Sequence, residues 1–240
     1  MVAWYHLNYL FLTMGGIGSR FGSDIPKQFT IVDKKPIFVY IIEAYCKLSY
    51  VDYIILIVNK NWIEYTNKII NSLHIDKPIT IVPGGATRSE SIKNAICSIK
   101  NSASLNDLIF VHDATHPYLD EPALLNAIEL MNSYDGVTLC QREYDTCYEV
   151  SDTDIVAEIP KKKVISGASP EIFRYGLLYD LYSSASLDDL ESMSSVGALV
   201  LSNGYSLGYV PMNCLNIKIT CPKDLALFEL LCGTYYFGEY

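Results

Sequence analysis

A glycine-rich segment near the N-terminus has the residue types that could bind a phosphate chain. Residues 14–22 read MGGIGSRFG and follow an apolar run, residues 7–12, that is typical of a buried strand. Arg20 and Lys27 bring two positive charges to the same segment. Glycines leave backbone N–H groups free to approach an anion, and here they are Gly15, Gly16, Gly18 and Gly22. The pattern predicts a cradle for a nucleoside triphosphate, although it matches neither the Walker A sequence nor the dinucleotide fingerprint.

Three further segments carry candidate site residues. Residues 83–91, PGGATRSES, lie between a predicted strand and a predicted helix, whose N-terminus favours anions; the alternative is an ordinary turn. In the segment VHDATHP, Asp113 ends a strand and is a natural Mg²⁺ ligand beside a triphosphate, or else it caps the turn. His116 of that segment contacts a ligand or is a surface imidazole. In residues 216–220, NIKIT, Lys218 lies opposite apolar neighbours, either as a site cation or as an edge-strand lysine that blocks aggregation.

Length and charge narrow the classes of function. The chain has 240 residues, enough for one large domain with a substantial core, and we expect a single domain over residues 1–240. A formal net charge of −9 argues against nucleic-acid binding, because a protein that binds nucleic acid requires a basic surface. No segment is apolar over enough residues to span a bilayer, so we expect no membrane insertion. Seven cysteines without C-x-x-C spacing indicate thiols in a reducing cytoplasm, and not zinc ligands or disulfides.

The hydrophobic pattern predicts the elements that must position these residues. Strand-like and helix-like stretches alternate over residues 7–140, which indicates an α/β fold with a mostly parallel sheet and helices on both faces. Such sheets bind ligands beyond the carboxyl ends of their strands, where the glycine segment and Asp113 both lie. Over residues 141–166 the alternation stops, and short strands predict a β-arm outside the sheet.

The expected strands are 7–14, 53–58, 79–82, 108–112, 136–140, 206–210 and 216–220. The expected helices are 37–47, 63–72, 88–99, 121–132, 171–183, 187–194 and 222–231.

Together, these segments resemble the cytidylyltransferase family that contains 2-C-methyl-D-erythritol 4-phosphate cytidylyltransferase and ribitol-5-phosphate cytidylyltransferase. The resemblance runs from Leu10 to about Phe228. The matching segments are GGIGSR at 15–20, PKQF at 26–29, GGATRSES at 84–91, HDA at 112–114, DT at 145–146, SPEIF at 169–173 and NIKIT at 216–220. The resemblance implies a Rossmann-like nucleotidyltransferase sheet with a protruding β-arm. It also implies an enzyme that transfers a cytidylyl group from CTP.

The family implies a role for each matching residue. The catalytic cations around the triphosphate would be Arg20, Lys27 and Lys218. The nucleotide would lie against Met14, Gly15, Gly16, Gly18, Gly85, Arg88, Ser91 and Asp113. Asp113 would also position Mg²⁺ or another divalent cation. The acceptor would contact His116, together with Thr146 and Lys162 on the arm, which family members exchange between the subunits of a homodimer.

Departures from the family pattern fall on the acceptor side. His116 stands where the family usually has an arginine, and Leu215 where the isoprenoid enzymes place a metal-binding aspartate. Lysines at 161–163 occupy the arm region of another family arginine, and ASPE at 168–171 replaces the usual QTPQ. The pair Gly15-Gly16 also resembles the polyol-phosphate branch more than the isoprenoid branch, whose loop usually carries alanines.

These departures favour D-ribitol 5-phosphate as the acceptor, giving a CDP-polyol such as CDP-ribitol for the synthesis of a cell-surface polymer. The first alternative is the enzyme of isoprenoid synthesis that acts on 2-C-methyl-D-erythritol 4-phosphate. The second is a non-catalytic nucleotide-binding protein. The retained cations at 20, 27 and 218 argue against that second alternative.

Overall fold

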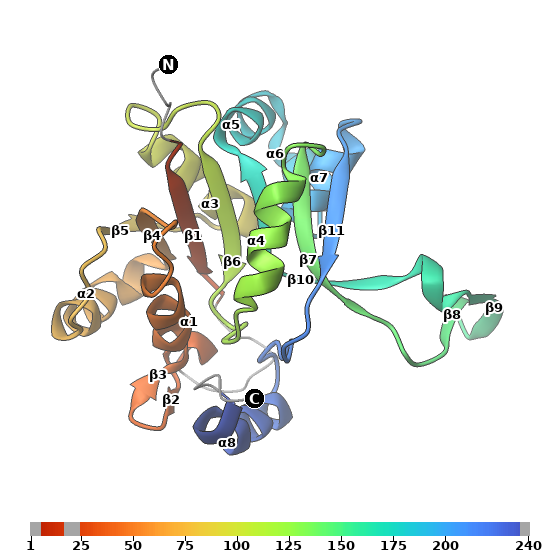
Figure 1. Cartoon of the computed structure of the whole chain (residues 1–240), viewed down its shortest axis with the longest axis horizontal. Helices are drawn as coiled ribbons and strands as arrows, with labels where there is room; N and C mark the ends of the chain where they lie inside the picture. The colour runs from red at the N-terminus through yellow and green to blue at the C-terminus, as the bar shows by residue number, and fades with distance from the viewer. Residues whose placement is uncertain (1–5, 17–24, 236–240) are drawn as a thin grey trace.

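A seven-stranded sheet with helices on both faces forms the body of the protein (Figure 1). The computed structural model describes residues 6–16 and 25–235. The strand order is β11-β7-β10-β6-β1-β4-β5. β10 runs antiparallel to both of its neighbours, and the other neighbouring pairs are parallel. The expected Rossmann-like, mostly parallel α/β sheet is therefore confirmed.

The strands of this sheet are β1 (Asn8–Met14), β4 (Tyr53–Val58), β5 (Ile79–Pro83), β6 (Leu108–Asp113), β7 (Gly136–Arg142), β10 (Ile165–Arg174) and β11 (Leu207–Pro211). The helices are α1 (Ile37–Cys46), α2 (Ile63–Ser72), α3 (Arg88–Ser98), α4 (Glu121–Leu130), α5 (Tyr175–Ser184), α6 (Leu187–Ser192), α7 (Val196–Ser202) and α8 (Pro222–Tyr235). Two short hairpins complete the fold: β2 (Ile31–Val32) with β3 (Lys35–Pro36), and β8 (Cys147–Ser151) with β9 (Asp154–Ile159).

The sheet is buried on both faces, because its strands alternate between two hydrophobic cores. In β1, Leu10 and Leu12 join the core that contains α1 and α4, whereas Tyr9 and Phe11 join the core that contains α3 and α5. Each fully buried Leu or Phe side chain stabilises the fold by roughly 1.5–3 kcal/mol. This packing makes β1 and β6 a rigid support for the loops at their carboxyl ends.

Two sequence predictions about elements are wrong. Residues 171–174 belong to strand β10, not to a helix, and helix α5 begins only at Tyr175. Ile172 and Phe173 point into opposite cores, so at this end of the strand two adjacent apolar residues replace the alternation of a half-buried strand. Residues 216–220 form no strand; they lie in a loop, where Ile219 is buried and Lys218 exposed.

The arm between β7 and β10 projects from the body as the hairpin β8–β9, followed by a short 3-10 helix at Lys161–Lys163 (Figure 1). Its apolar side chains are largely exposed, with Tyr144 at 81% and Val150 at 67%. Exposed apolar surface of this kind often marks a contact with another chain. Over the described residues, no helix has the length and hydropathy that crossing a bilayer requires.

Candidate active site

A cavity of about 890 Å³ opens at the carboxyl ends of β1 and β6. Clefts of this size hold small-molecule ligands. The sequence-predicted residues that line it are Met14, Gly15, Gly16, Lys27, Gly85, Arg88, Ser91, Asp113, His116 and Lys218. The parallel sheet thus brings segments from both ends of the chain to one edge, as the strand-end argument predicted.

Four predicted site residues are not part of this lining. Arg20 and Gly18 fall within residues 17–24, outside the described residues. Thr146 and Lys162 are exposed on the arm, which extends away from the body of its own chain (Figure 1). Any contact of these two residues with a substrate would therefore require the cavity of another subunit.

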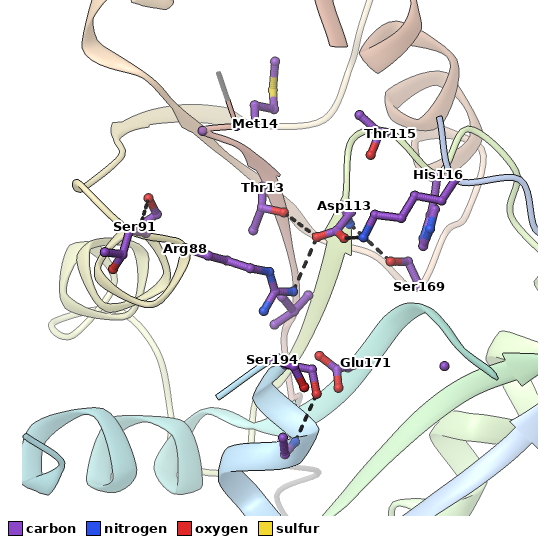
Figure 2. Close-up of a pocket in the computed structure, with 18 of the residues that line it drawn as sticks. Thr13, Met14, Arg88, Ser91, Asp113, Thr115, His116, Ser169, Glu171 and Ser194 are labelled. Carbon is purple, nitrogen blue, oxygen red and sulfur yellow. Dashed lines mark hydrogen bonds and ion pairs between the residues drawn. The ribbon is translucent and has the colours of Figure 1, made fainter. Parts of the chain in front are cut away.

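Asp113 lies at the centre of the charged part of the cavity (Figure 2). Its Oδ2 accepts a hydrogen bond from Lys218 Nζ at 2.8 Å. Its Oδ1 accepts hydrogen bonds from Thr13 Oγ1 at 2.8 Å and from an Arg88 terminal nitrogen at 3.4 Å. Burial disfavours the ionised carboxyl, but the charges of Arg88 and Lys218 outweigh it and hold the pKa of Asp113 well below its usual range.

Asp113 also fits one position in the coordination of a divalent cation. Among the described residues its three hydrogen-bond partners occupy three of the roughly four lone-pair sites of a carboxylate, which leaves one on Oδ2. Mg²⁺ commonly uses one or two carboxylates together with substrate phosphates and water. Among the described residues, no three His, Cys, Asp or Glu side chains gather to hold a metal. A cation at Asp113 would therefore depend on the phosphates of the nucleotide.

The turn before α3 is shaped by hydrogen bonds of its own side chains. Thr87 caps the helix, because its side chain accepts a hydrogen bond from Glu90 N. The Ser91 hydroxyl donates to Thr87 O at 2.8 Å and accepts from Gly85 N at 3.0 Å. An added Cβ on Gly85 would lie 2.4 Å from Glu90 Cγ, so the turn requires a residue without a side chain there. These contacts fix the side of the cavity that faces β5.

Gln28 is a site residue whose role the sequence did not reveal. Its side-chain amide is buried and donates to Met14 O at 2.6 Å and to Gly16 O at 3.1 Å. It therefore holds the start of the glycine segment against the short 3-10 helix at Lys27–Phe29. The only sequence signal was its place in the PKQF segment.

Two histidines at the end of β6 are buried and neutral. Tyr45 Oη lies 3.1 Å from His112 Nδ1, and His112 Nε2 lies 2.9 Å from His116 O. Burial lowers the pKa of His112 to about 4. It lowers the pKa of His116 to about 3, against the opposing effect of Asp113, and His116 Nδ1 has no hydrogen-bond partner among the described residues. His116 thus supplies a neutral imidazole to the cavity, not a cation.

The far wall of the cavity is polar, and strand β10 provides much of it. Ser169 Oγ accepts a hydrogen bond from Asp113 N at 3.3 Å, and Glu171 faces the cavity from the same strand. An irregularity in the pairing of β10 with β7 falls between Gly167 and Glu171, where such bulges redirect side chains. The sequence pointed to Glu171 only as part of ASPE, a departure from the family pattern, and not as a site residue. The cavity thus has a cationic side, suited to phosphates, and a polar side.

Comparison with known proteins identifies the family. The family model for 2-C-methyl-D-erythritol 4-phosphate cytidylyltransferase (IspD) matches residues 9–233. The chain belongs to this family. As a member of it, the protein is an enzyme, a CTP-dependent cytidylyltransferase, as the sequence predicted.

Individual relatives agree over nearly the whole length. A 2-C-methyl-D-erythritol 4-phosphate cytidylyltransferase of Thermosipho melanesiensis is 31% identical over 222 residues, which cover 92% of this chain and 96% of the relative. The crystal structure of 4-diphosphocytidyl-2C-methyl-D-erythritol synthase from Anaerococcus prevotii has a TM-score of 0.80 at 18% identity, over 95% of this chain and 99% of that one. The Francisella tularensis 2-C-methyl-D-erythritol 4-phosphate cytidylyltransferase has a TM-score of 0.75 at 24% identity, over 93% and 99%. At these identities the two structures support the fold.

The expectation of ribitol 5-phosphate as acceptor, with a CDP-polyol for a cell-surface polymer, is wrong. The family model and the Thermosipho relative both point to the isoprenoid enzyme instead. The structure explains why the departures misled. Among the described residues, an added Cβ on Gly16 would meet nothing within 4 Å, and one on Gly15 would come no closer than 3.5 Å to Ser91 Oγ, so these residues leave room for alanine as well as glycine. Leu215 packs against the core near α8 and does not line the cavity.

Proposed function

We propose that the enzyme transfers the cytidylyl group of CTP to 2-C-methyl-D-erythritol 4-phosphate and releases pyrophosphate. The proposal rests chiefly on the 31% identity with the Thermosipho relative, which spans almost all of both chains and is named for that acceptor. The cationic side of the cavity supports it, because a reaction between two phosphate groups requires positive charge at one place.

The proposed reaction forms one bond and breaks another at the α-phosphorus of CTP. A phosphate oxygen of the acceptor attacks that phosphorus, and the bond to the bridging oxygen of pyrophosphate breaks. A phosphate monoester is already largely ionised near neutral pH, so no general base is required. The protein must instead hold two anions in line and cancel their repulsion. We assign this to Lys27 and Lys218, and to Arg20, which lies outside the described residues.

The nucleotide would lie between the glycine segment and the turn before α3. Backbone N–H groups at Gly15 and Gly16 would bind phosphate oxygens, and Gly18, outside the described residues, would continue this cradle. Gly85 and Ser91 would border the nucleoside, and Arg88 would extend across it from the first turn of α3. We propose His116 as a neutral hydrogen-bonding contact for the acceptor.

A divalent cation, Mg²⁺ by preference, would bind Asp113 together with the phosphates of CTP. Such an ion neutralises the developing charge on the transferred group. Because Asp113 keeps one lone pair on Oδ2 while it holds Lys218, the carboxylate can orient the lysine and the ion at the same time.

The enzyme would act as a single cytidylyltransferase domain over residues 1–240 and as a homodimer through its arm. The exposed apolar side chains of residues 141–166 suit a contact with a second chain. Thr146 and Lys162 of one subunit would then reach the acceptor in its partner. We place the enzyme in the cytoplasm, where its seven thiols would stay reduced.

Pyrophosphate release with CTP and Mg²⁺ tests this function. We expect turnover with 2-C-methyl-D-erythritol 4-phosphate, and little with ribitol 5-phosphate or glycerol phosphates at equal concentration. Lys27→Ala is expected to abolish turnover, while an exposed lysine outside the cavity, in Lys68→Ala, serves as the control. Absence of turnover with the methylerythritol acceptor, with CTP bound by calorimetry, would overturn the proposal.

A further inference from the structure

A buried carboxylate that the proposed reaction does not use lies on the wall of the cavity. Glu171 is only 8% exposed, and its side chain faces the same cavity as Asp113 and Arg88 (Figure 2). Among the described residues, no lysine, arginine or histidine forms an ion pair with it. Burying a carboxylate without a paired charge is costly, so its retention here calls for a reason.

The protein is shaped to hold this carboxylate in place. Glu171 Oε1 accepts a hydrogen bond from Gly197 N at 2.8 Å, and Oε2 accepts one from Val196 N at 3.2 Å. An added Cβ on Gly197 would lie 2.6 Å from Oε1, so only glycine admits the carboxylate at this distance. Two oxygens fixed by backbone groups give the carboxylate one orientation against the cavity.

Hydrogen bonds within the chain do not fully compensate the charge of Glu171. Burial raises the pKa of Glu171, although the charge of Arg88, the N–H of Gly197 and the hydroxyl of Ser195 oppose the increase. The two backbone N–H groups occupy two of the roughly four lone-pair sites of the carboxylate, and even with the Ser195 hydroxyl beside it at least one site stays open. A perturbed carboxylate with spare acceptor capacity in a cavity is a candidate for ligand binding.

The chemistry of Glu171 restricts the group that could bind it. A carboxylate repels phosphate, and it accepts hydrogen bonds, so the partner must be a donor such as a hydroxyl. The sheet order places the turn at Gly85 and Ser91 beside β5, Asp113 at the end of β6, and Glu171 on β10, beyond β6. Glu171 therefore lies on the opposite side of the phosphate site from the nucleoside, where the acceptor must approach.

We infer that Glu171 accepts a hydrogen bond from a hydroxyl of the acceptor and so selects polyhydroxylated phosphates. This inference rests on the proposed function, which places the nucleoside at Ser91 and a polyol phosphate on the other side. The acceptor's phosphate would face the lysines and its hydroxyls would face β10. A ribose hydroxyl of CTP offers the same chemistry, and the experiment below separates the two sources.

Acceptor analogues that each lack one hydroxyl provide the test. With the wild-type enzyme, one such analogue is expected to lose about 10–100-fold in kcat/KM, the effect of one hydrogen bond to a charged group. In Glu171→Gln, kcat/KM for the parent acceptor should fall by a comparable factor. The variant should then have about the same kcat/KM for the analogue as for the parent. KM for CTP should stay within about twofold, because the nucleoside lies elsewhere.

Asp120→Asn is the matched control. Asp120 is also a buried carboxylate that holds backbone N–H groups, at 2.9 Å from Ala123 and 2.6 Å from Asn213, but it does not line the cavity. This control should keep the wild-type preference for the parent over the analogue. Where Glu171→Gln does not fold, Gly197→Ala displaces the carboxylate and carries the same expectation.

Three results would overturn the inference. The first is a Glu171→Gln variant that still prefers the parent acceptor over the analogue as strongly as wild type does. The second is a rise in KM for CTP in Glu171→Gln with KM for the acceptor unchanged, which would assign Glu171 to the ribose. The third is loss of discrimination in Asp120→Asn as well, which would make the effect structural. Wild-type enzyme that releases no pyrophosphate with the parent acceptor instead rejects the proposed function, and the inference with it.

Discussion

Replacing Lys218 by methionine should separate turnover from stability. Lys218 Nζ lies 2.8 Å from Asp113 Oδ2, yet the lysine side chain is 48% exposed. The lysine end of this pair is half exposed, whereas Asp113 is only 19% exposed, so we take the upper end of the range for exposed pairs, about 1 kcal/mol, as its contribution to folding. Asp113 would keep its bonds from Thr13 and Arg88, so the variant would not leave an unpaired buried charge. For a chain of this length, a loss of that size lowers Tm by at most about 4 °C.

The effect on turnover should be much larger. Lys218 would neutralise charge that develops at the α-phosphorus, and removal of one such preorganised donor costs about 10²–10³ in kcat, or about 2.7–4 kcal/mol. Pyrophosphate release at saturating CTP and acceptor measures kcat, and scanning calorimetry measures Tm. The effect on kcat should exceed the effect on Tm because the charge of Lys218 matters most when the two phosphates come together.

Lys68→Met is the control for loss of a lysine ion pair. Lys68 is also 2.8 Å from its partner, Glu64, but the pair lies on the exposed face of α2, away from the cavity. This variant should keep both kcat and Tm close to wild type. A fall in kcat of less than about tenfold in Lys218→Met would refute the assignment of Lys218 to the reaction, and a fall in Tm well beyond 4 °C would refute the small contribution of the ion pair to folding.

Other predictions concern the glycine segment, the buried histidine and the core. Gln28→Leu should weaken CTP binding about tenfold in calorimetric titration, because two backbone carbonyls of the glycine segment lose their buried donor; unchanged affinity would exclude that role. Because the pKa of His116 is about 3, against about 6.5 when unfolded, the unfolded chain takes up the extra proton below pH 6.5 and stability falls on acidification. Denaturant unfolding measures how much the free energy of unfolding falls between pH 6.5 and pH 5, and this fall should be about 2 kcal/mol smaller in His116→Gln than in wild type. An equal fall in both proteins would contradict the buried neutral imidazole. Gly136→Ala should lower stability by about 1–3 kcal/mol by chemical denaturation, since its Cβ would lie 2.5 Å from Phe173 Cε1 in the core, whereas a neutral effect would mean that Phe173 moves freely.

Local patterns in the sequence predicted much of the site. The glycine segment, Asp113 and the turn before α3 each follow a strand with a clear apolar run, and their placement at one sheet edge is confirmed by the cavity that they line. The patterns failed where burial removed the alternation of a strand. Ile172 and Phe173 of strand β10 are buried on opposite faces, so the sequence pattern predicted the end of this strand as the start of helix α5, and it marked Glu171 only as a departure from the family pattern.

The acceptor illustrates a different limit. His116, Leu215 and the glycine pair were weighed equally as departures from the family, because a sequence does not say which side chains face a cavity. In the structure only some of them do. Leu215 packs against the core beside α8, and the glycine pair has room for a methyl group as far as the described residues reach, so neither carries information about the acceptor.

By itself the sequence determined the class of chemistry, because glycine freedom, fixed charge and the period of apolar residues are local properties of the chain. It predicted a phosphate cradle after the first strand and placed a carboxylate at the end of β6. Only the tertiary structure decided which groups meet: Asp113 with Lys218, 105 residues later, and Glu171 with the start of α7. Those meetings depend on the order of strands in the sheet and on the antiparallel insertion of β10 between β6 and β7, which no local pattern encodes.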